Sequence, residues 1–268
     1  QKTNATQNET KQALQQLIYA ETSLNGFERL NHARPRALEY IKSLEKINNA
    51  QKSALEDKVT QSHDLLELEH IVNEGTNLND IMGELANAIV NNYAPTKASI
   101  NYINADNLRK DNFTQAINNA RDALNKTQGQ NLDFNAIDTF KDDIFKTKDA
   151  LNGIERLTAA KSKAEKLIDS LKFINKAQFT HANDEIINTN SIAQLSRIVN
   201  QAFDLNDAMK SLRDELNNKA FPVQASSNYI NSDEDLKQQF DHALSNARKV
   251  LAKENGKNLR SEEHTSEL

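Results

Sequence analysis

The chain has 268 residues, a net charge of −5 and a mean hydropathy of −0.74, with no Cys, no Trp, six Gly and three Pro. This polarity excludes a membrane-embedded protein, and the missing Cys excludes a disulfide framework and thiolate metal sites. The few Gly and Pro residues exclude architectures of many short strands joined by tight turns, so helices should dominate. The length allows one or two domains with a sizeable core. The sequence shows no signal peptide, and we expect any export or anchoring segment to lie outside it.

The sequence repeats itself at a constant offset of 127 residues. Leu-Asn-Gly-Phe-Glu-Arg-Leu at residues 24–30 returns as Leu-Asn-Gly-Ile-Glu-Arg-Leu at residues 151–157, and Asn-Tyr-Ile-Asn at residues 101–104 returns at residues 228–231. No gap is needed to align the two copies. Such self-similarity decides the fold organisation, because each repeat is one structural unit.

The repeat predicts a first module at residues 1–127 and a second at residues 128–254. Residues 255–268 would begin a third repeat and then continue into a tail. From residue 261 onwards the tail departs from the repeat, so we interpret it as divergent or foreign and exclude it from the fold.

The first helix of each copy contains a change of phase. Ile137, Phe140 and Ile144 keep heptad spacing, whereas the apolar positions from Leu157 onwards come one residue early, beside Gly153. We predict one unbroken helix over residues 134–172 whose two halves face different neighbours. In the first copy, a Pro at position 35 predicts a kink or restart near residues 31–35 that the second copy lacks.

Three further elements follow in each copy. A short helix carries Leu55 and Val59, and a long amphipathic helix is predicted at residues 64–92 and again at residues 191–219. A loop at residues 95–105 comes next. The last helix is capped by Asp106 or, in the second copy, by Asp233.

The long helices carry apolar stripes that should be buried. The stripe residues are Leu68, Ile71, Leu78, Met82 and Leu85 in the first copy, and Leu195, Ile198, Leu205, Met209 and Leu212 in the second. Two of the four helices in a copy are long enough to belong to two bundles at once. We therefore predict an all-α fold of tandem three-helix bundles that share long connecting helices and form an elongated rod.

Several motifs at this one spacing resemble a known family. They are the repeated Leu-Asn-Gly-x-Glu-Arg-Leu, Asn-Asn-Ala-Gln-Lys at residues 48–52, Leu-Asn-Asp-x-Met near residues 78 and 205, and the Asn-Tyr-Ile-Asn loops. The chain resembles the giant staphylococcal surface adhesins built from FIVAR-type bundles and bundles like the albumin-binding GA module. The second copy departs from the pattern at Lys176 and Phe179. Albumin binding depends on particular surface residues, so we do not expect it from the fold alone.

The resemblance implies a bacterial cell-surface, cell-wall-associated protein that is not an enzyme. Its implied partners are fibronectin, another host matrix protein or a cell-wall glycan. Two functions stay open: an elongated stalk that is itself an adhesin, with repetition supplying avidity, or a purely structural spacer that supports the cell envelope. An intracellular spectrin-like scaffold is a weaker third possibility. We expect a monomer that is not membrane-embedded.

The sequence carries no pattern of catalysis and suggests no cofactor. His63, Glu67 and His70 would share one helical face, but their counterparts in the second copy are Asn190, Gln194 and Arg197, so we expect solvated surface and no metal site. Basic residues alternate with acidic ones, which excludes a nucleic-acid footprint.

The Asn-Tyr-Ile-Asn loops are the candidate ligand contacts. The residues are Asn101, Tyr102 and Asn104 in the first copy and Asn228, Tyr229 and Asn231 in the second. An aromatic ring flanked by amides could present a periodic binding surface. The competing interpretation, which we favour, is that the Tyr side chains fix the loop to its bundle. For the Leu-Asn-Gly motif we likewise favour close helix packing at the Gly over recognition.

Overall fold

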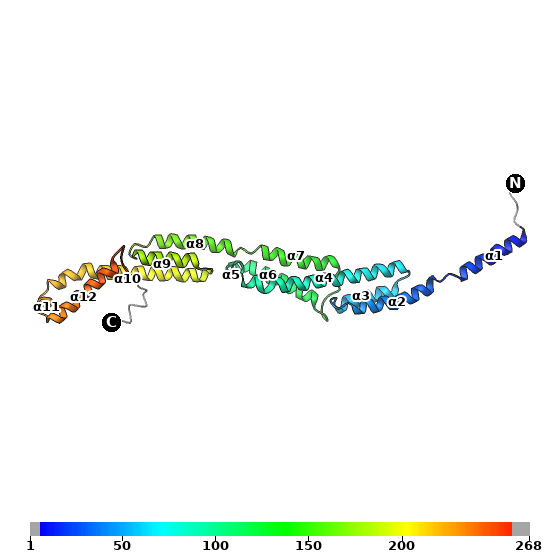
Figure 1. The fold of residues 1–268 in the computed structure, drawn as a ribbon, viewed down its shortest axis with the longest axis horizontal. Helices are drawn as coiled ribbons and strands as arrows, with labels where there is room; N and C mark the ends of the chain where they lie inside the picture. The colour runs from blue at the N-terminus through cyan, green and yellow to red at the C-terminus, as the bar shows by residue number, and fades with distance from the viewer. Residues whose placement is uncertain (1–5, 259–268) are drawn as a thin grey trace, which may run out of the picture. The chain divides into compact units, whose positions relative to one another are not determined.

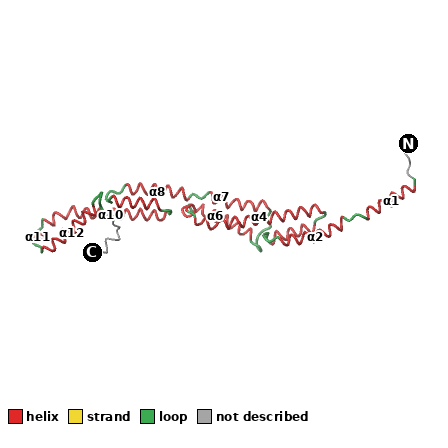
Figure 2. The backbone as a smooth tube through the Cα atoms, in the orientation of Figure 1, coloured by secondary structure: helices red, strands yellow, loops and turns green. Residues whose placement is uncertain are grey.

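The computed structural model describes residues 6–258, which are helical throughout and contain no strand (Figures 1 and 2). The chain divides into two compact units. Unit 1 consists of residues 1–96 and 111–150, and unit 2 of residues 97–110 and 151–268. This division follows spatial packing and differs from the sequence repeat of 127 residues, because residues 97–110 of the first repeat pack with the second.

Each unit holds helices of both long and short kinds. Unit 1 contains α1 (Gln7–Thr22), α2 (Gly26–Ser43), α3 (Asn49–Gln61), most of α4 (Leu65–Ala98), most of α6 (Asn107–Leu124) and α7 (Phe134–Asp149). Unit 2 contains α5 (Ile100–Asn104), α8 (Gly153–Asp169), α9 (Lys176–Asn188), α10 (Ile192–Gln224), α11 (Ser227–Ile230) and α12 (Glu234–Leu251).

The first bundle of unit 1 packs α2 and α3 against the first half of α4. Ile41, Leu55 and Val59 are buried between the helices. Gly75 on α4 makes room for them, since a Cβ there would lie 2.7 Å from Ile41 Cδ1. The three helices meet because their apolar positions recur every three or four residues, and that periodicity gives each helix one apolar face.

The corresponding bundle of unit 2 consists of α8, α9 and the first half of α10. Its core contains Ile168, Ile174 and Ile186, all at most 2% exposed. Ala182 replaces Leu55, and Ala202 replaces Gly75. The smaller residue on the short helix is thus matched by a larger one on the long helix, which keeps the core filled.

The second bundle of unit 1 packs the second half of α4 with α6 and α7. Leu85, Phe113, Ile137 and Ile144 are fully buried there. Between α7 and α4, Lys141 Nζ pairs with Glu84 Oε2 at 2.8 Å and Lys148 Nζ donates to Asn92 Oδ1 at 2.9 Å. The tandem three-helix bundles with shared long helices are therefore confirmed.

The predicted stripe on the long helix is confirmed in the first copy and only partly in the second. All five stripe residues of α4 are buried. On α10, Leu195 and Met209 are buried, whereas Ile198, Leu205 and Leu212 are half-buried. Leu85 and Leu212 differ because α7 covers α4, and in unit 2 the second half of α10 packs with α11 and α12.

Three expectations about helix continuity were wrong. The helix predicted over residues 134–172 is interrupted: α7 ends at Asp149 and α8 begins at Gly153. The long helix does not end before residue 95, because α4 continues through its Pro to Ala98 and α10 continues through Pro222. Helix α2 likewise runs through Pro35 without restarting. A Pro removes one N–H donor, and tertiary packing outweighs that loss here.

Candidate functional site

The Asn-Tyr-Ile-Asn segment is a one-turn helix and not an open loop. Ser99 Oγ accepts from Tyr102 N at 3.1 Å and so caps α5, which packs against α8. Ser and Thr are preferred at this position because a side-chain oxygen satisfies an otherwise unpaired N–H of the first turn. The sequence thus builds a rigid corner at the point where α4 gives way to α6.

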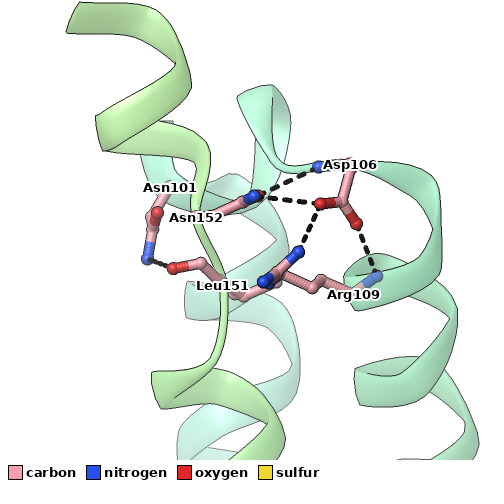
Figure 3. Close-up of polar contacts among 5 residues, drawn as sticks. All are labelled: Asn101, Asp106, Arg109, Leu151 and Asn152. Atoms are coloured by element: carbon pink, nitrogen blue, oxygen red, sulfur yellow. Dashed lines mark hydrogen bonds and ion pairs between the residues drawn. The ribbon is translucent and has the colours of Figure 1, made fainter.

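Asn101 holds the break between α7 and α8 (Figure 3). Its Nδ2 donates to Leu151 O at 3.1 Å, and its Oδ1 accepts from Ile154 N at 3.0 Å. A Cβ on Gly153 would lie only 1.9 Å from the carbonyl oxygen of Asn101. The predicted packing role of this Gly is therefore confirmed.

Asp106 and Asn152 add a second pair of bonds beside the first (Figure 3). Asn152 Nδ2 donates to Asp106 Oδ2 at 2.9 Å, and Asp106 N donates to Asn152 Oδ1 at 3.2 Å. Asp106 also caps α6 as predicted, because Arg109 N donates to Asp106 Oδ1 at 3.0 Å. This backbone hydrogen bond, helped by the side chains of Asn152 and Arg109, lowers the pKa of the Asp106 carboxyl below its ordinary value.

Asn104 reaches the start of the next long helix. Its Nδ2 donates to Asn190 O at 2.8 Å, and its Oδ1 accepts from Ile192 N, the first residue of α10, at 2.9 Å. The side chain is buried, so both halves of its amide are used inside the protein.

These contacts form one connected set, which we name the inter-repeat lock: Asn101, Asn104, Asp106, Asn152 and Gly153. Its members come from the end of the first repeat and the start of the second, and all lie in unit 2. Two of the predicted ligand contacts, Asn101 and Asn104, are therefore structural partners in the first copy.

Tyr102 points away from this lock toward charged side chains. The ammonium groups of Lys97 and Lys110 each lie 5.8 Å from the centre of its ring, in cation–π geometry. Tyr102 is half-buried, and the neighbouring Ile103 is exposed. The outer side of α5 thus presents an aromatic ring with cations and an aliphatic residue.

The second copy keeps the motif but not its contacts. The side chains of Asn228 and Asn231 are exposed, and Asn231 Nδ2 donates to Ser227 O at 2.8 Å. Tyr229 OH donates to Asp241 Oδ2 at 2.7 Å, which raises the pKa of the Tyr, and its ring packs edge-on against Phe240 at 5.7 Å. Tyr229 thus fixes α11 to α12. Whether the six predicted residues contact a ligand stays a prediction.

A second polar cluster was not identified as a site in the sequence. Asn48 and Gln51 form a capping box at the start of α3 and are both fully buried. Asn48 Nδ2 donates to Gln130 O at 2.9 Å, and Gln51 Nε2 donates to Leu132 O at 2.9 Å. Lys126 Nζ donates to Ile47 O at 2.6 Å, and burial lowers the pKa of this Lys. We name this set the intra-repeat lock.

The intra-repeat lock is reproduced in the second copy. Asn175 and Gln178 form the same capping box, Asn175 Nδ2 donates to Lys257 O at 3.0 Å, and Lys253 Nζ donates to Ile174 O at 2.6 Å. The retained Asn, Gln and Lys at the 127-residue offset were the available signal. The departures lie outside the lock, since Lys176 contributes its backbone N–H, as Asn49 does, and Phe179 packs on the core.

The residues that might suggest a metal are used elsewhere. Glu67 Oε2 accepts from the backbone N of His63 at 2.6 Å. Across residues 6–258, no group of three or more His, Asp or Glu side chains is arranged to hold a metal ion. Over the same residues, every helix is too short or too polar to cross a membrane.

Models of two repeat families match the chain in alternation. The GA module model matches residues 27–81 and 154–208, and the FIVAR domain model matches residues 82–152 and 208–263. The GA matches correspond to the bundles formed by α2, α3 and the start of α4 and by α8, α9 and the start of α10.

Among curated proteins, the chain is 37% identical over 255 residues to the extracellular matrix-binding protein ebh of Staphylococcus aureus strain MW2, covering 95% of the chain and 3% of that relative. It is 36% identical over 255 residues to EbhA of strain Mu3, covering 95% of the chain and 4% of that relative. A crystal structure of an EbhA domain from S. aureus superposes with a TM-score of 0.66 at 28% identity, covering 72% of this chain and 79% of that one.

Proposed function

Because the chain belongs to the family of FIVAR and GA repeat proteins, we propose that it is a segment of a cell-wall-associated bacterial surface protein that acts as both stalk and adhesin. The family is one of non-enzymatic adhesin repeats. The proposed ligand class is extracellular matrix protein, with fibronectin as the first candidate. The support for this class is the name of the relatives, which are described as extracellular matrix-binding proteins and match 95% of the chain.

The chain spans only a few per cent of the length of these relatives, so the adhesive role must be tested on this segment itself. A stalk needs repeats that do not hinge independently of one another. The two locks support that role, because buried amides joined to backbone groups are costly to separate. In the intra-repeat lock, Asn48 and Gln51 tie the start of α3 to residues 123–132 of the same repeat.

The adhesive surface that we propose is the outer side of α5 and α11. Asn101 and Asn104 are used in the inter-repeat lock, which leaves Tyr102 and Ile103 for a partner. Ile103 is 49% exposed and its counterpart Ile230 is 59% exposed. An aliphatic residue beside an aromatic ring and cations suits a partner that carries apolar and acidic groups.

The test is a concentration series of the chain on immobilised fibronectin. Saturable binding at micromolar affinity or tighter is expected, and it should weaken when Ile103 and Ile230 are both replaced by Ser. Val90→Ser is the matched control, because Val90 is an exposed aliphatic residue on α4 away from α5. Binding that both variants retain would remove the proposed surface while leaving the adhesin function intact.

The alternative function is a structural spacer without a ligand of its own. The observation that favours it is the use of Asn101 and Asn104 inside the protein, where the sequence predicted recognition. Absence of binding to fibronectin, to other matrix proteins and to cell-wall glycan would support the spacer and exclude the adhesin.

A further inference from the structure

The packing of α7 shows what the second bundle of a repeat needs in order to be complete. Ile137 and Ile144 of α7 are fully buried against α4 and α6, and with them Leu85 and Phe113 are fully buried as well. In each repeat, the helix in the position of α7 is the first helix of the following copy by the 127-residue offset. A complete second bundle therefore combines two helices of one repeat with one helix of the next.

The second repeat leaves the receiving side of this arrangement uncovered. Leu212, Leu216 and Phe240, the counterparts of fully or largely buried residues on α4 and α6, are half-buried, and Ala243 is exposed. These side chains line an apolar groove between α10 and α12. We define the tail face as this groove together with Asn228, Asn231 and Asp233.

The first repeat leaves the inserting side uncovered. Leu17, the counterpart of the buried Ile144, is 65% exposed on α1, and Leu24 is 79% exposed where its counterpart Leu151 is buried. A Cβ on Gly26 would meet no atom within 4 Å, whereas its counterpart Gly153 packs on backbone atoms. We define the head face as the apolar side of α1 together with Leu24, Asn25 and Gly26.

The two faces carry all the residues of the inter-repeat lock. At the 127-residue offset, the lock on the tail side keeps Asn101, Asn104 and Asp106 as Asn228, Asn231 and Asp233. On the head side, Asn152 and Gly153 are kept as Asn25 and Gly26. Every side chain that makes the lock within the chain is thus available a second time, split between the two faces.

The charges of the two faces are complementary as well. Within the chain, Lys148 Nζ of α7 donates to Asn92 of α4 at 2.9 Å. The counterparts of these two residues are Glu21 on the head face and Lys219 on the tail face. The same position that holds a hydrogen bond within the chain would hold an ion pair between a head face and a tail face.

We propose that separate copies of this chain associate head to tail, with α1 of one copy inserted into the groove between α10 and α12 of the next. The lock would then form between Asn228, Asn231 and Asp233 of one copy and Asn25 and Gly26 of its neighbour. The contact is heterologous, since each copy keeps one unused face of each kind, so association continues into open chains. The monomer expected from the sequence is then the dilute limit.

The inference goes beyond the proposed function and does not depend on a matrix ligand. Two sets of variants test it on the full chain, each placed at exposed positions so that the single copy folds unchanged. The head variant combines Leu17→Ser with Gly26→Ala, because a Cβ on the counterpart Gly153 would lie 1.9 Å from Asn101 O. The tail variant combines Asn228→Ala with Ala243→Glu, which places a charge where the counterpart Ala116 is buried.

Sedimentation velocity with light scattering measures the association over a concentration series. The wild-type chain should show masses that rise in steps of 30.2 kDa. Each variant alone should remain a monomer, with association weakened by at least about 30-fold, the effect of losing a central interface contact. A mixture of the two variants should form a one-to-one dimer that grows no further, because only one functional pair of faces remains.

Circular dichroism and thermal unfolding of each variant verify that the single copy is folded. A Val90→Ser chain, altered on an exposed site outside both faces, should associate like the wild type. A wild-type chain that stays monomeric at its highest soluble concentration would overturn the proposal, whether its faces stay empty or are covered by its own α1. A dimer that forms equally in wild type and in both variants would overturn it too, since its contact would lie elsewhere.

Discussion

The carbonyl oxygen of Asn101 occupies the space into which a side chain at position 153 would project, since a Cβ on Gly153 would lie 1.9 Å from it. The backbone of α5 and the start of α8 can approach this closely only where the side chain is a hydrogen atom. The Gly is required for packing and not for an unusual dihedral angle, because none of the described Gly residues has a positive φ.

We therefore predict that Gly153→Ala destabilises the chain by about 1–3 kcal/mol, the usual range for overpacking. The matched control is Gly26→Ala, where the new methyl group meets no atom in a single copy. Chemical denaturation at a concentration where the chain is monomeric measures both. Equal effects at the two positions would mean that the backbone at Asn101 yields without cost.

The intra-repeat lock yields a prediction with a control supplied by the protein itself. Asn48→Ala removes a capping box and leaves the carbonyl groups of Ala123 and Gln130 without this donor, so it should cost about 2–4 kcal/mol. Asn49→Lys introduces the residue that the second copy has at position 176, where only the backbone N–H is used. It should change the free energy of unfolding by less than about 0.5 kcal/mol.

The two copies of the long helix should respond unequally to the same truncation. Leu85→Ala removes a fully buried side chain and should cost about 2–5 kcal/mol. Leu212→Ala removes a half-buried one and should cost clearly less, because fewer neighbours surround it. Urea unfolding of the two variants gives the comparison, and a larger loss at position 212 would contradict the burial pattern.

Acid should weaken the inter-repeat lock through Asp106. Its pKa is lowered in the folded protein by the hydrogen bond from Arg109 N, so its contribution to stability is complete above the pKa of the unfolded chain, about 3.9. That contribution is lost as the pH falls through the lowered folded-state pKa. In a pH series of denaturant unfolding, the stability difference between wild type and Asp106→Asn should shrink below about pH 4.

A constant difference between wild type and Asp106→Asn down to the most acidic condition would contradict a role for the ionised carboxyl. Asp233→Asn controls for the loss of one negative charge, because the Asp233 side chain makes no capping hydrogen bond to α12.

The Tyr pair distinguishes recognition from packing. Tyr102→Ala removes a ring that lies between two Lys side chains, and Tyr229→Ala removes the hydrogen bond to Asp241 and the contact with Phe240. We expect Tyr229→Ala to lower the melting temperature and Tyr102→Ala to leave it closer to wild type. Loss of fibronectin binding in Tyr102→Ala without a loss of melting temperature would identify α5 as a recognition surface. Loss of stability in both variants, with no binding by the wild type, would establish the spacer.

The helical class, the four helices per repeat and the buried stripe of α4 could all be predicted from the sequence. Each depends on local periodicity, and the repeat doubles the evidence by showing which positions are retained. The family resemblance likewise depends on motifs at one spacing, such as Asn-Asn-Ala-Gln-Lys at residues 48–52. Periodicity determines which face of a helix is apolar, and that holds before any neighbour is known.

Only the tertiary structure decided where helices stop and what the amides do. The break before Gly153 has no local cause that the phase change could separate from a continuous helix; it exists because Asn101 binds the backbone at Leu151 and Ile154. The extension of α4 through Pro95 is decided in the same way, by packing that outweighs one missing hydrogen bond. An Asn side chain reads alike in a loop that binds a ligand and in one that binds its own chain, because the partner atoms lie 50 or more residues away.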